Sequence, residues 1–398
     1  MPKTTIREIQ GEEMLDIMYW LNNYAFMSSP PMPDKTKWQE RISKRLKNQS
    51  RPTFFALFED DEPLAAVATS PLTQNVRGAL FGMGGIWGVA THPNGRRKGY
   101  SRRVLAKTLA FIRDDERPLS CLYPFRESFY ERLGYATFPQ PRTARFSPTT
   151  LAPLLKKDLE GEVELSLIGE SYDAYLDYLH KIQGHTHGMA VFERDQKEDS
   201  QRNNYWLAQA RVDGEVVGVM MYDLRGEELM HFKLTASRFY YHTSQGRYLL
   251  LAWIARHIDQ ADRVELRLPP FEHPETWQAD MEIEIAAHFV PPMGRVLDVA
   301  KIGGMQTSAG HFSARVRDSL CPWNEGVWQF ETVNGQLQVS KTDDADCDLN
   351  IQALAALVYG THDPGDFAIK DWGTPPPAVQ TVMRTMFPRL IPYLHESY

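Results

Sequence analysis

The spacing of apolar residues predicts a mixed α/β segment over roughly the first 150 positions. Apolar residues recur at helical spacing in two stretches separated by prolines. Strand-like runs follow, and after them the pattern predicts a helix, a strand and a short helix. The predicted elements lie at residues 11–26, 35–46, 53–59, 64–70, 79–90, 104–112, 119–123 and 125–135. A proline-rich stretch at residues 140–152 indicates a domain boundary.

A second segment repeats this rhythm. Its hairpin turns at Asp213-Gly214, and a strand, a helix and a further strand follow, as in the first segment. We interpret it as a diverged duplicate of the first. A third segment starts near residue 293, with a hairpin turn at Asn334-Gly335 and a helix that ends at Gly360. The predicted domains are residues 1–147, 148–292 and 293–398.

Composition and charge exclude several classes of protein. The 398 residues are 42% hydrophobic with a mean hydropathy of −0.43, and no stretch is apolar enough for a transmembrane helix. The net charge of −7 argues against a general nucleic-acid or anionic-membrane binder. Three widely spaced cysteines form no metal motif, and the charged N-terminus does not resemble a signal peptide. We therefore expect a cytoplasmic protein without a metal.

One stretch, between Val89 and Ser101, reverses the sign of the charge. A strand ends there, a polar loop turns at Gly99 and a helix begins, and a helix start presents unpaired backbone N–H groups that bind anions. Five basic residues and no acid lie close together: Arg96, Arg97, Lys98, Arg102 and Arg103. The stretch predicts an anionic ligand, the alternative being a solvated helix surface. It is neither a GxxxxGK[ST] nucleotide loop nor a GxGxxG dinucleotide loop.

The loop resembles the pyrophosphate loop Q/R-x-x-G-x-G/A of the GNAT superfamily of N-acetyltransferases, with Arg96 and Gly99 at its first two defined positions. Ser101 stands at the third, where it departs from the usual Gly or Ala but is still small. Residues 128–135 are similar to the enhanced intracellular survival (Eis) family, which joins two GNAT-like folds to a sterol-carrier-protein-like domain. The resemblance implies an α+β protein. Two GNAT-like mixed-sheet α/β domains, the first catalytic and the second degenerate, would precede a sterol-carrier-protein-like α/β domain.

The same resemblance assigns roles to individual residues. The backbone of Val89 and Thr91 would pair with the pantetheine arm of acetyl-CoA. Four residues would surround its pyrophosphate: Arg96, Arg97, Gly99 and Ser101. Tyr130 would be the general acid that protonates the CoA thiolate, and the C-terminal carboxylate of Tyr398 would be the general base. Trp38 would line the substrate pocket, the alternative being a core tryptophan.

The implied reaction moves an acetyl group from acetyl-CoA to a primary amine. The amine would be small or peptidyl, and of aminoglycoside, polyamine or lysine type. Because members of the family form hexamers, the resemblance also implies a homo-oligomer, with no nucleic-acid or membrane partner. The alternative from another class is a protein that binds a lipid or another apolar ligand, with a vestigial GNAT fold.

Four further features are weighed against simpler explanations. His185 and His187 could share a metal, but no third ligand is evident and a polar loop is favoured. His92 contacts CoA or lies in a surface loop. Residues 244–248 stand where the second domain would have its pyrophosphate loop, but they lack the R-x-x-G spacing and are interpreted as non-catalytic. The acidic run at residues 343–348 lacks the calcium-loop pattern and is expected to favour the start of the next helix.

Overall fold

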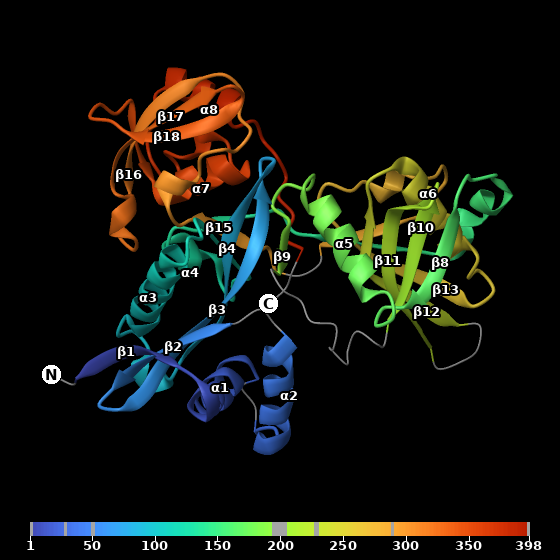
Figure 1. The fold of residues 1–398 in the computed structure, drawn as a ribbon, viewed down its shortest axis with the longest axis horizontal. Helices are drawn as coiled ribbons and strands as arrows, with labels where there is room; N and C mark the ends of the chain where they lie inside the picture. Colours follow the sequence, from blue (N-terminus) through green and yellow to red (C-terminus); the bar gives the residue numbers. More distant parts are fainter. Residues whose placement is uncertain are drawn as a thin grey trace. The chain divides into compact units, whose positions relative to one another are not determined.

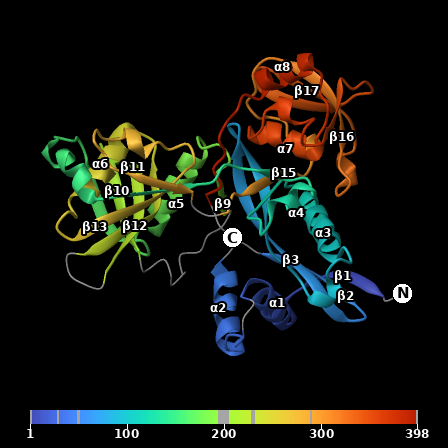
Figure 2. The ribbon, with the colours of Figure 1, turned by 180° about the vertical axis from the view of Figure 1, so that it is seen from behind.

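The structure of the protein is a computed structural model, which describes residues 3–27, 30–48, 52–192, 205–226, 231–287 and 290–395 (Figure 1 and Figure 2). The chain divides into two compact units. The first unit consists of Met1–Pro139, Thr186–Gln196 and Val290–Tyr398, and the second of Gln140–His185 and Lys197–Phe289. Segments that are distant in sequence therefore share the first unit.

The first unit contains an eight-stranded mixed sheet. Neighbouring strands follow the order β1 (Thr4–Ile9), β2 (Thr53–Glu59), β3 (Glu62–Val76), β4 (Ala79–Thr91), β5 (Leu119–Leu122), β15 (Met293–Val296) and β6 (Ala136–Thr137), and β9 (Ala190–Phe192) also pairs with β3. All pairs are antiparallel except β4 with β5. Because helix α3 (Tyr100–Asp114) connects these two parallel strands, they form a β–α–β unit inside the sheet.

Helices cover both faces of this sheet. Phe54 and Ala56 of β2 share a core with α1 (Gly11–Phe26) and α2 (Lys35–Asn48). The intervening Phe55 and Leu57 share another core with α3 and with α4 (Glu127–Glu131). Successive side chains of a strand point to opposite faces, so a sheet covered on both faces requires the nearly continuous apolar run seen in β2.

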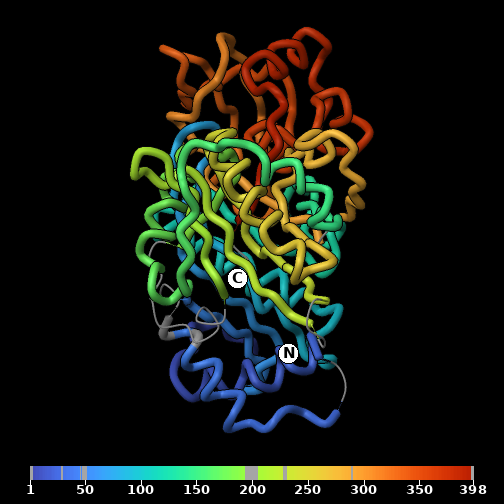
Figure 3. The backbone as a smooth tube through the Cα atoms, turned by 90° about the vertical axis from the view of Figure 1, so that its right-hand side faces the viewer, coloured from blue at the N-terminus to red at the C-terminus, as the bar shows by residue number. Residues whose placement is uncertain are grey.

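The C-terminal part of the first unit adds a four-stranded sheet and two helices. The strand order is β18 (Gln336–Lys341), β17 (Gly326–Val333), β16 (His311–Arg317) and β19 (Cys347–Asn350), and the helices are α7 (Ile351–Tyr359) and α8 (Pro377–Met386). Figure 1 and Figure 3 show this part, in orange and red, at the opposite end of the first unit from α1 and α2. Phe312 and Leu354 belong to the same hydrophobic core as Leu72 and Leu119, so the two sheets are packed as one body. Of the nine α7 residues only Gln352 is not buried, so α7 is enclosed on all sides.

The second unit has a seven-stranded sheet of its own. The strand order is β14 (Glu284–Ala287), β7 (Arg142–Phe146), β13 (Ala261–Leu268), β12 (Phe232–Tyr241), β11 (Glu215–Arg225), β10 (Trp206–Val212) and β8 (Glu162–Leu167), with helices α5 (Tyr172–Gln183) and α6 (Ser244–Ala255). The series β10–β11–β12–α6–β13 has the same order as β2–β3–β4–α3–β5, and its last two strands are again parallel. This repetition supports the interpretation of the second segment as a duplicate of the first.

Two short strands lie in places that the sequence does not predict. Strand β7 falls inside predicted domain 1–147, yet it pairs with β13 and β14 in the second unit. Strand β15 falls at the start of predicted domain 293–398, yet it lies between β5 and β6 in the first unit. A strand of only four or five residues carries no sign of which sheet it enters, because pairing between distant segments decides it. The three predicted domain ranges remain a prediction.

The acidic run at residues 343–348 has a different role from the one expected. Strand β19 intervenes before α7, and no acid lies in the first turn of that helix. The Asp346 carboxylate instead accepts hydrogen bonds of 2.7 Å from the backbone N–H and 2.9 Å from the hydroxyl of Ser313. The acidic run therefore helps to hold the chain against β16.

Candidate active site

The parallel strands β4 and β5 separate at their carboxyl ends. Their pairing runs from Met83 opposite Leu119 to Ile86 opposite Leu122, whereas β4 continues to Thr91. Among the described strands, residues 87–91 therefore pair only with β3, and a bulge interrupts that pairing at Gly88, whose φ is 61°. The carboxyl ends of parallel strands are where ligands bind in such sheets. The backbone of Val89 and Thr91 lies at this separation, and its pairing with a pantetheine arm stays a prediction.

The loop after β4 brings the chain to an uncapped helix start. One turn of helix (Pro93–Gly95) is capped by Nδ1 of His92, which accepts a 3.3 Å hydrogen bond from the backbone N–H of Asn94. Gly99 precedes α3 with a φ of 76°, and no side chain among the described residues caps α3. A Cβ atom at Gly99 would meet nothing within 4 Å. The α3 N-terminus is thus open and electropositive, which is what an anionic group requires.

Three of the five basic residues near this loop already have partners within the protein. Lys98 forms a 2.8 Å ion pair with Glu59, and the guanidinium of Arg102 donates a 3.1 Å hydrogen bond to the hydroxyl of Ser319. Arg103 donates to the Thr4 hydroxyl at 2.9 Å.

The two arginines nearest the loop turn are different. Arg96 and Arg97 are exposed, and neither has a carboxylate partner among the described residues; Arg96 lies over the ring of Tyr24, 5.6 Å from its centre. Arg97 adopts a φ of 62°, which is uncommon for a residue with a side chain. Arg96, Arg97, Gly99 and Ser101 remain together at the helix start, so the structure brings the predicted pyrophosphate residues to one place.

Tyr130 lies on α4 within an aromatic cluster. Its ring centre is 5.0 Å from that of Phe129 and 5.7 Å from that of Phe125, and its side chain is buried in the core formed with α3. Burial raises the pKa of the Tyr130 hydroxyl above its usual value, so it stays protonated. This hydroxyl has no hydrogen-bond partner in the described part of the chain, and an unpartnered donor suits the role of an acid.

The described C-terminal segment ends near β5. Tyr398 lies outside the described residues, which extend to His395. The hydroxyl of Tyr123, next to the end of β5, donates a 3.2 Å hydrogen bond to the carbonyl oxygen of Leu394. Three residues span at most about 10 Å. The role of the Tyr398 carboxylate stays a prediction.

Trp38 lies in the hydrophobic core rather than at an open surface. It is 6% exposed on α2, and its ring meets Tyr19 edge-on with centres 5.5 Å apart. This arrangement fits the core alternative, and a contact of Trp38 with substrate stays a prediction.

The corresponding helix of the second unit is closed to an anion. The Thr243 hydroxyl caps α6 by accepting a 3.0 Å hydrogen bond from the backbone N–H of Gly246. A Cβ atom at Gly246 would lie 2.4 Å from the carbonyl oxygen of Val217, so no space remains there. The Arg247 guanidinium lies 5.7 Å or less from the ring centres of three aromatic residues, Tyr241, Tyr248 and Trp277. The contrast with α3 supports the interpretation of this element as non-catalytic.

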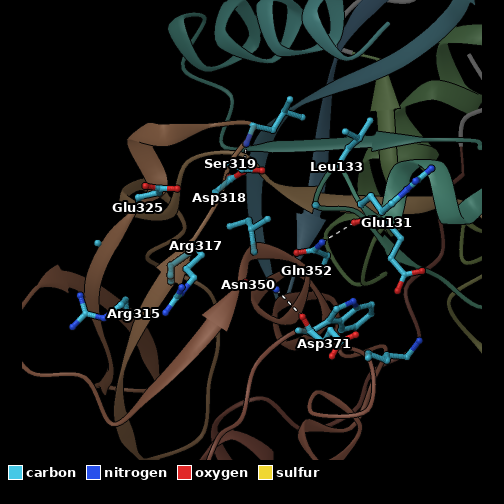
Figure 4. A pocket seen from close by; sticks show the side chains of 18 of the residues that line it. Glu131, Leu133, Arg315, Arg317, Asp318, Ser319, Glu325, Asn350, Gln352 and Asp371 are labelled. Carbon is cyan, nitrogen blue, oxygen red and sulfur yellow. Dashed lines mark hydrogen bonds between the residues drawn. The ribbon is translucent and has the colours of Figure 1, made fainter. Parts of the chain in front are cut away.

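A cavity of about 1130 Å³ lies beyond the end of α4 (Figure 4). In Figure 4 the Gln352 side chain reaches toward Glu131, and its Nε2 donates a 2.8 Å hydrogen bond to the Glu131 carbonyl oxygen. Arg315 and Arg317, which also line the cavity, lie 3.5 and 3.4 Å from carboxylate oxygens of Asp348. Basic and acidic side chains are mixed in its wall, so we assign it no ligand.

The described residues offer neither a metal site nor a membrane-spanning helix. They contain no group of three or more His, Cys, Asp and Glu side chains placed to hold a metal ion. None of their helices is both long and apolar enough to cross a membrane. His187 lies in a loop, as expected, and its ring is engaged in hydrogen bonds described below.

Comparisons with known proteins agree with this architecture. Residues 5–138 match the acetyltransferase (GNAT) domain family, and residues 304–369 match the sterol carrier protein domain family. The chain is similar to the crystal structure of a GCN5-related N-acetyltransferase from Anabaena variabilis, with 16% identity, a TM-score of 0.82 and full coverage of both chains. A GCN5-related N-acetyltransferase from Kribbella flavida has 18% identity, a TM-score of 0.80 and 100% and 99% coverage.

Eis1 from Mycobacterium abscessus also shares the fold along the chain, with 14% identity, a TM-score of 0.78, and coverage of 99% of this chain and 100% of Eis1. No curated protein matches the sequence. The predicted fold class, two GNAT-like domains and a sterol-carrier-protein-like domain, is confirmed. The prediction of an acyltransferase enzyme is confirmed at the level of the domain family. The chain therefore has a GNAT acetyltransferase domain at its N-terminus and a sterol carrier protein domain at its C-terminus, and its fold is similar to that of Eis1.

Proposed function

We propose that the protein is an acetyl-CoA-dependent N-acetyltransferase that acts on a primary amine. The observation that carries this proposal is the uncapped α3 N-terminus, directly after the separating strands β4 and β5, with Arg96 and Arg97 unpaired with any carboxylate in the described part of the chain. The equivalent helix in the second unit has a cap and no such opening. A ligand with both a diphosphate and an extended amide-bearing arm fits the two features together.

Acetyl-CoA is such a ligand. Its pyrophosphate would accept hydrogen bonds from the backbone N–H groups at Gly99 and Ser101 and from the two arginines. Its pantetheine arm would pair with the backbone of residues 87–91, which has no strand partner on the side of β5 among the described residues. The arm then leads the thioester toward Tyr130.

The chemistry is direct transfer. The amine nitrogen attacks the thioester carbonyl carbon, a base removes the proton from nitrogen, the tetrahedral intermediate collapses, and the C–S bond breaks. The Tyr398 carboxylate is proposed as the base and Tyr130 as the acid that protonates the departing thiolate. A backbone N–H near Val89 is proposed to stabilise the oxyanion.

The acceptor is proposed to be an aminoglycoside-, polyamine- or lysine-like amine, with Trp38 supporting the pocket on the α1–α2 side. We further propose a cytoplasmic homo-oligomer. The three cysteines are all free and buried, which suits a reducing compartment.

The alternative, an apolar-ligand carrier with a vestigial acetyltransferase fold, has less support. The C-terminal sheet is filled by its own side chains, with the rings of Phe312 and Phe330 stacked at 5.0 Å. Helix α7 is buried against the neighbouring sheet. These contacts favour a structural role for the third domain.

A CoA-release assay with a panel of amines tests the proposal, together with thermal shift by acetyl-CoA. We expect acetyl-CoA to raise the melting temperature and at least one amine class to give turnover. Arg96→Ala and Gly99→Asp should weaken both effects. No shift by acetyl-CoA and unchanged behaviour of these variants would reject the acetyltransferase; a co-purified lipid in their place would support the carrier.

A further inference from the structure

Arg77 occupies the turn between β3 and β4, and its charge is buried. The side chain is 4% exposed, and no carboxylate pairs with it among the described residues. Its Nε donates a 2.8 Å hydrogen bond to the carbonyl oxygen of Val358, and one terminal nitrogen donates to those of Leu357 and Pro388, each at 2.9 Å. A cation without a counter-ion is costly to bury unless such donors are satisfied.

The three carbonyl oxygens that accept hydrogen bonds from Arg77 belong to two different parts of the chain, which Arg77 connects. Leu357 and Val358 lie at the C-terminal end of α7, where the last carbonyls have no partner four residues on in the helix and carry partial negative charge. Pro388 begins the last segment of the chain, residues 388–395, which runs to Tyr123 beside β5. One guanidinium therefore links the acetyltransferase sheet, α7 and the C-terminal segment.

His187 makes a second link at the same place. Its Nδ1 accepts a 3.1 Å hydrogen bond from the backbone N–H of Arg77, and its Nε2 donates a 3.0 Å hydrogen bond to the carbonyl oxygen of Tyr359. The carbonyl oxygen of His187 accepts a 2.9 Å hydrogen bond from the backbone N–H of Tyr393. A Cβ atom at Gly188 would lie 2.8 Å from that same Tyr393 nitrogen, so the two backbones are in close contact.

A buried polar network holds this junction to β3. The Gln74 amide donates a 2.9 Å hydrogen bond to the carbonyl oxygen of Gly188 and accepts one of 2.9 Å from the Tyr359 hydroxyl. At the other end of α7, Gln352 donates to the carbonyl oxygen of Glu131, the residue after Tyr130 (Figure 4). Helix α7 thus touches the element that carries Tyr130 at one end and the C-terminal segment at the other.

We propose that Arg77 and His187 are positioning residues for the reaction: they hold residues 388–395 in place and so set where the Tyr398 carboxylate can reach. This inference rests on the proposed function, in which that carboxylate is the base. Neither residue touches a reacting atom. A displacement of about 1 Å in a catalytic group can cost about 100-fold in rate.

The test is a double-mutant cycle in the full chain. Its arms are His187→Ala, deletion of Tyr398, and both changes together, with kcat and the KM for acetyl-CoA measured in each. We expect His187→Ala to lower kcat by about 10- to 100-fold at unchanged KM, because the pyrophosphate loop is untouched. In the chain that lacks Tyr398 the same substitution should have no further effect on kcat.

Two companion variants distinguish loss of the positioning contact from a general folding defect. His187→Gln keeps an acceptor and a donor, and it should restore most of kcat, whereas Arg77→Met should behave like His187→Ala. His185→Ala, two residues away on an exposed side chain, is the matched control and should leave kcat unchanged. Hydrogen exchange of residues 388–395 should be faster in His187→Ala than in His187→Gln.

The possible failures are distinguishable. If deletion of Tyr398 lowers kcat but His187→Ala leaves it unchanged, or lowers it by the same factor with and without Tyr398, the positioning role is rejected and the proposed base stands. If deletion of Tyr398 leaves kcat unchanged, the proposed base is rejected, and the positioning role is rejected with it. If the hydrogen-exchange rates of residues 388–395 are unchanged in both His187→Ala and Arg77→Met, the proposal that Arg77 and His187 hold this segment is rejected.

Discussion

The hydroxyl of Tyr123 donates a hydrogen bond of 3.2 Å to the carbonyl oxygen of Leu394. Tyr123 follows the last residue of β5, at the end of the strand pair where the thioester is proposed to lie. Leu394 is 2% exposed, so the described end of the chain is packed rather than solvated. A segment that is ordered this close to the separating strands is the arrangement that a base on Tyr398 requires.

The first prediction concerns Tyr398 itself. Deletion of Tyr398 moves the carboxylate by one residue, and amidation neutralises it. Each change should lower kcat by about 100-fold or more, the usual contribution of a general base. Tyr398→Phe should have little effect, because the proposed chemistry uses the main-chain carboxylate. Steady-state kinetics of the three proteins with one amine would decide the matter, and equal kcat values would exclude this base.

The second prediction separates two neighbouring tyrosines. The Tyr130 hydroxyl has no partner among the described residues, so Tyr130→Phe should leave the melting temperature nearly unchanged and lower kcat by about 100-fold. Burial raises the pKa of Tyr130, so the acid stays protonated and activity should not fall through its ionisation below about pH 10.

Tyr135 is the matched control. Its hydroxyl lies 2.8 Å from that of Ser120 in a fully buried position. Tyr135→Phe should cost about 1–3 kcal/mol of unfolding free energy, because the Ser120 hydroxyl loses its partner, and kcat should be retained. The opposite pattern, a stable but inactive Tyr135→Phe and an active Tyr130→Phe, would remove Tyr130 from the mechanism.

The third prediction concerns two adjacent basic residues that differ in their ion pairing. Arg97 has no carboxylate partner among the described residues, whereas Lys98 is paired with Glu59. Arg97→Ala should raise the KM for acetyl-CoA by about 10- to 100-fold at nearly constant kcat, since it removes a charge-assisted hydrogen bond made alike in the ground and transition states. Lys98→Met should change this KM by less than about threefold. Titration of acetyl-CoA at saturating amine measures both, and similar KM values for the two variants would contradict the assignment.

The sequence predicts those parts of the fold that depend on local signals. Hairpin turns such as Asn334-Gly335, the helix end at Gly360 and the uncapped loop before α3 all follow from residue type and spacing within a few positions. The sequence does not predict that β15 enters the first sheet, because a strand of four residues carries too little pattern to specify its partner strands.

The same limit applies to the candidate site. Charge runs in sequence could not show that Lys98 is neutralised by Glu59, which lies 39 positions earlier. Nor could they single out Arg77, whose acceptors lie between 280 and 311 positions away in the chain and are backbone carbonyls rather than acids. The sequence distinguishes His187 only by its neighbour His185, whereas the hydrogen-bonding link that His187 forms depends on Tyr359 and Tyr393.

The last prediction follows from the neutral state of His187. Burial lowers its pKa to about 4, whereas an unperturbed histidine has a pKa of about 6.5. Between these values the unfolded chain binds a proton at this site and the folded chain does not. Stability must therefore fall as pH drops from 6.5 toward 4, by about 3 kcal/mol in total, and this site adds no pH dependence above 6.5.

His187→Gln removes that titration while keeping a donor and an acceptor. Whatever its unfolding free energy at pH 7, its further loss of unfolding free energy between pH 7 and pH 4.5 should be about 2–3 kcal/mol smaller than in the unmodified protein. His362, whose pKa burial also lowers to about 4, titrates equally in both proteins and cancels in the difference. Urea unfolding at the two pH values measures this difference. Equal losses would mean that His187 is charged or solvated in the folded protein, and the hydrogen bond that it accepts from Arg77 could then not persist.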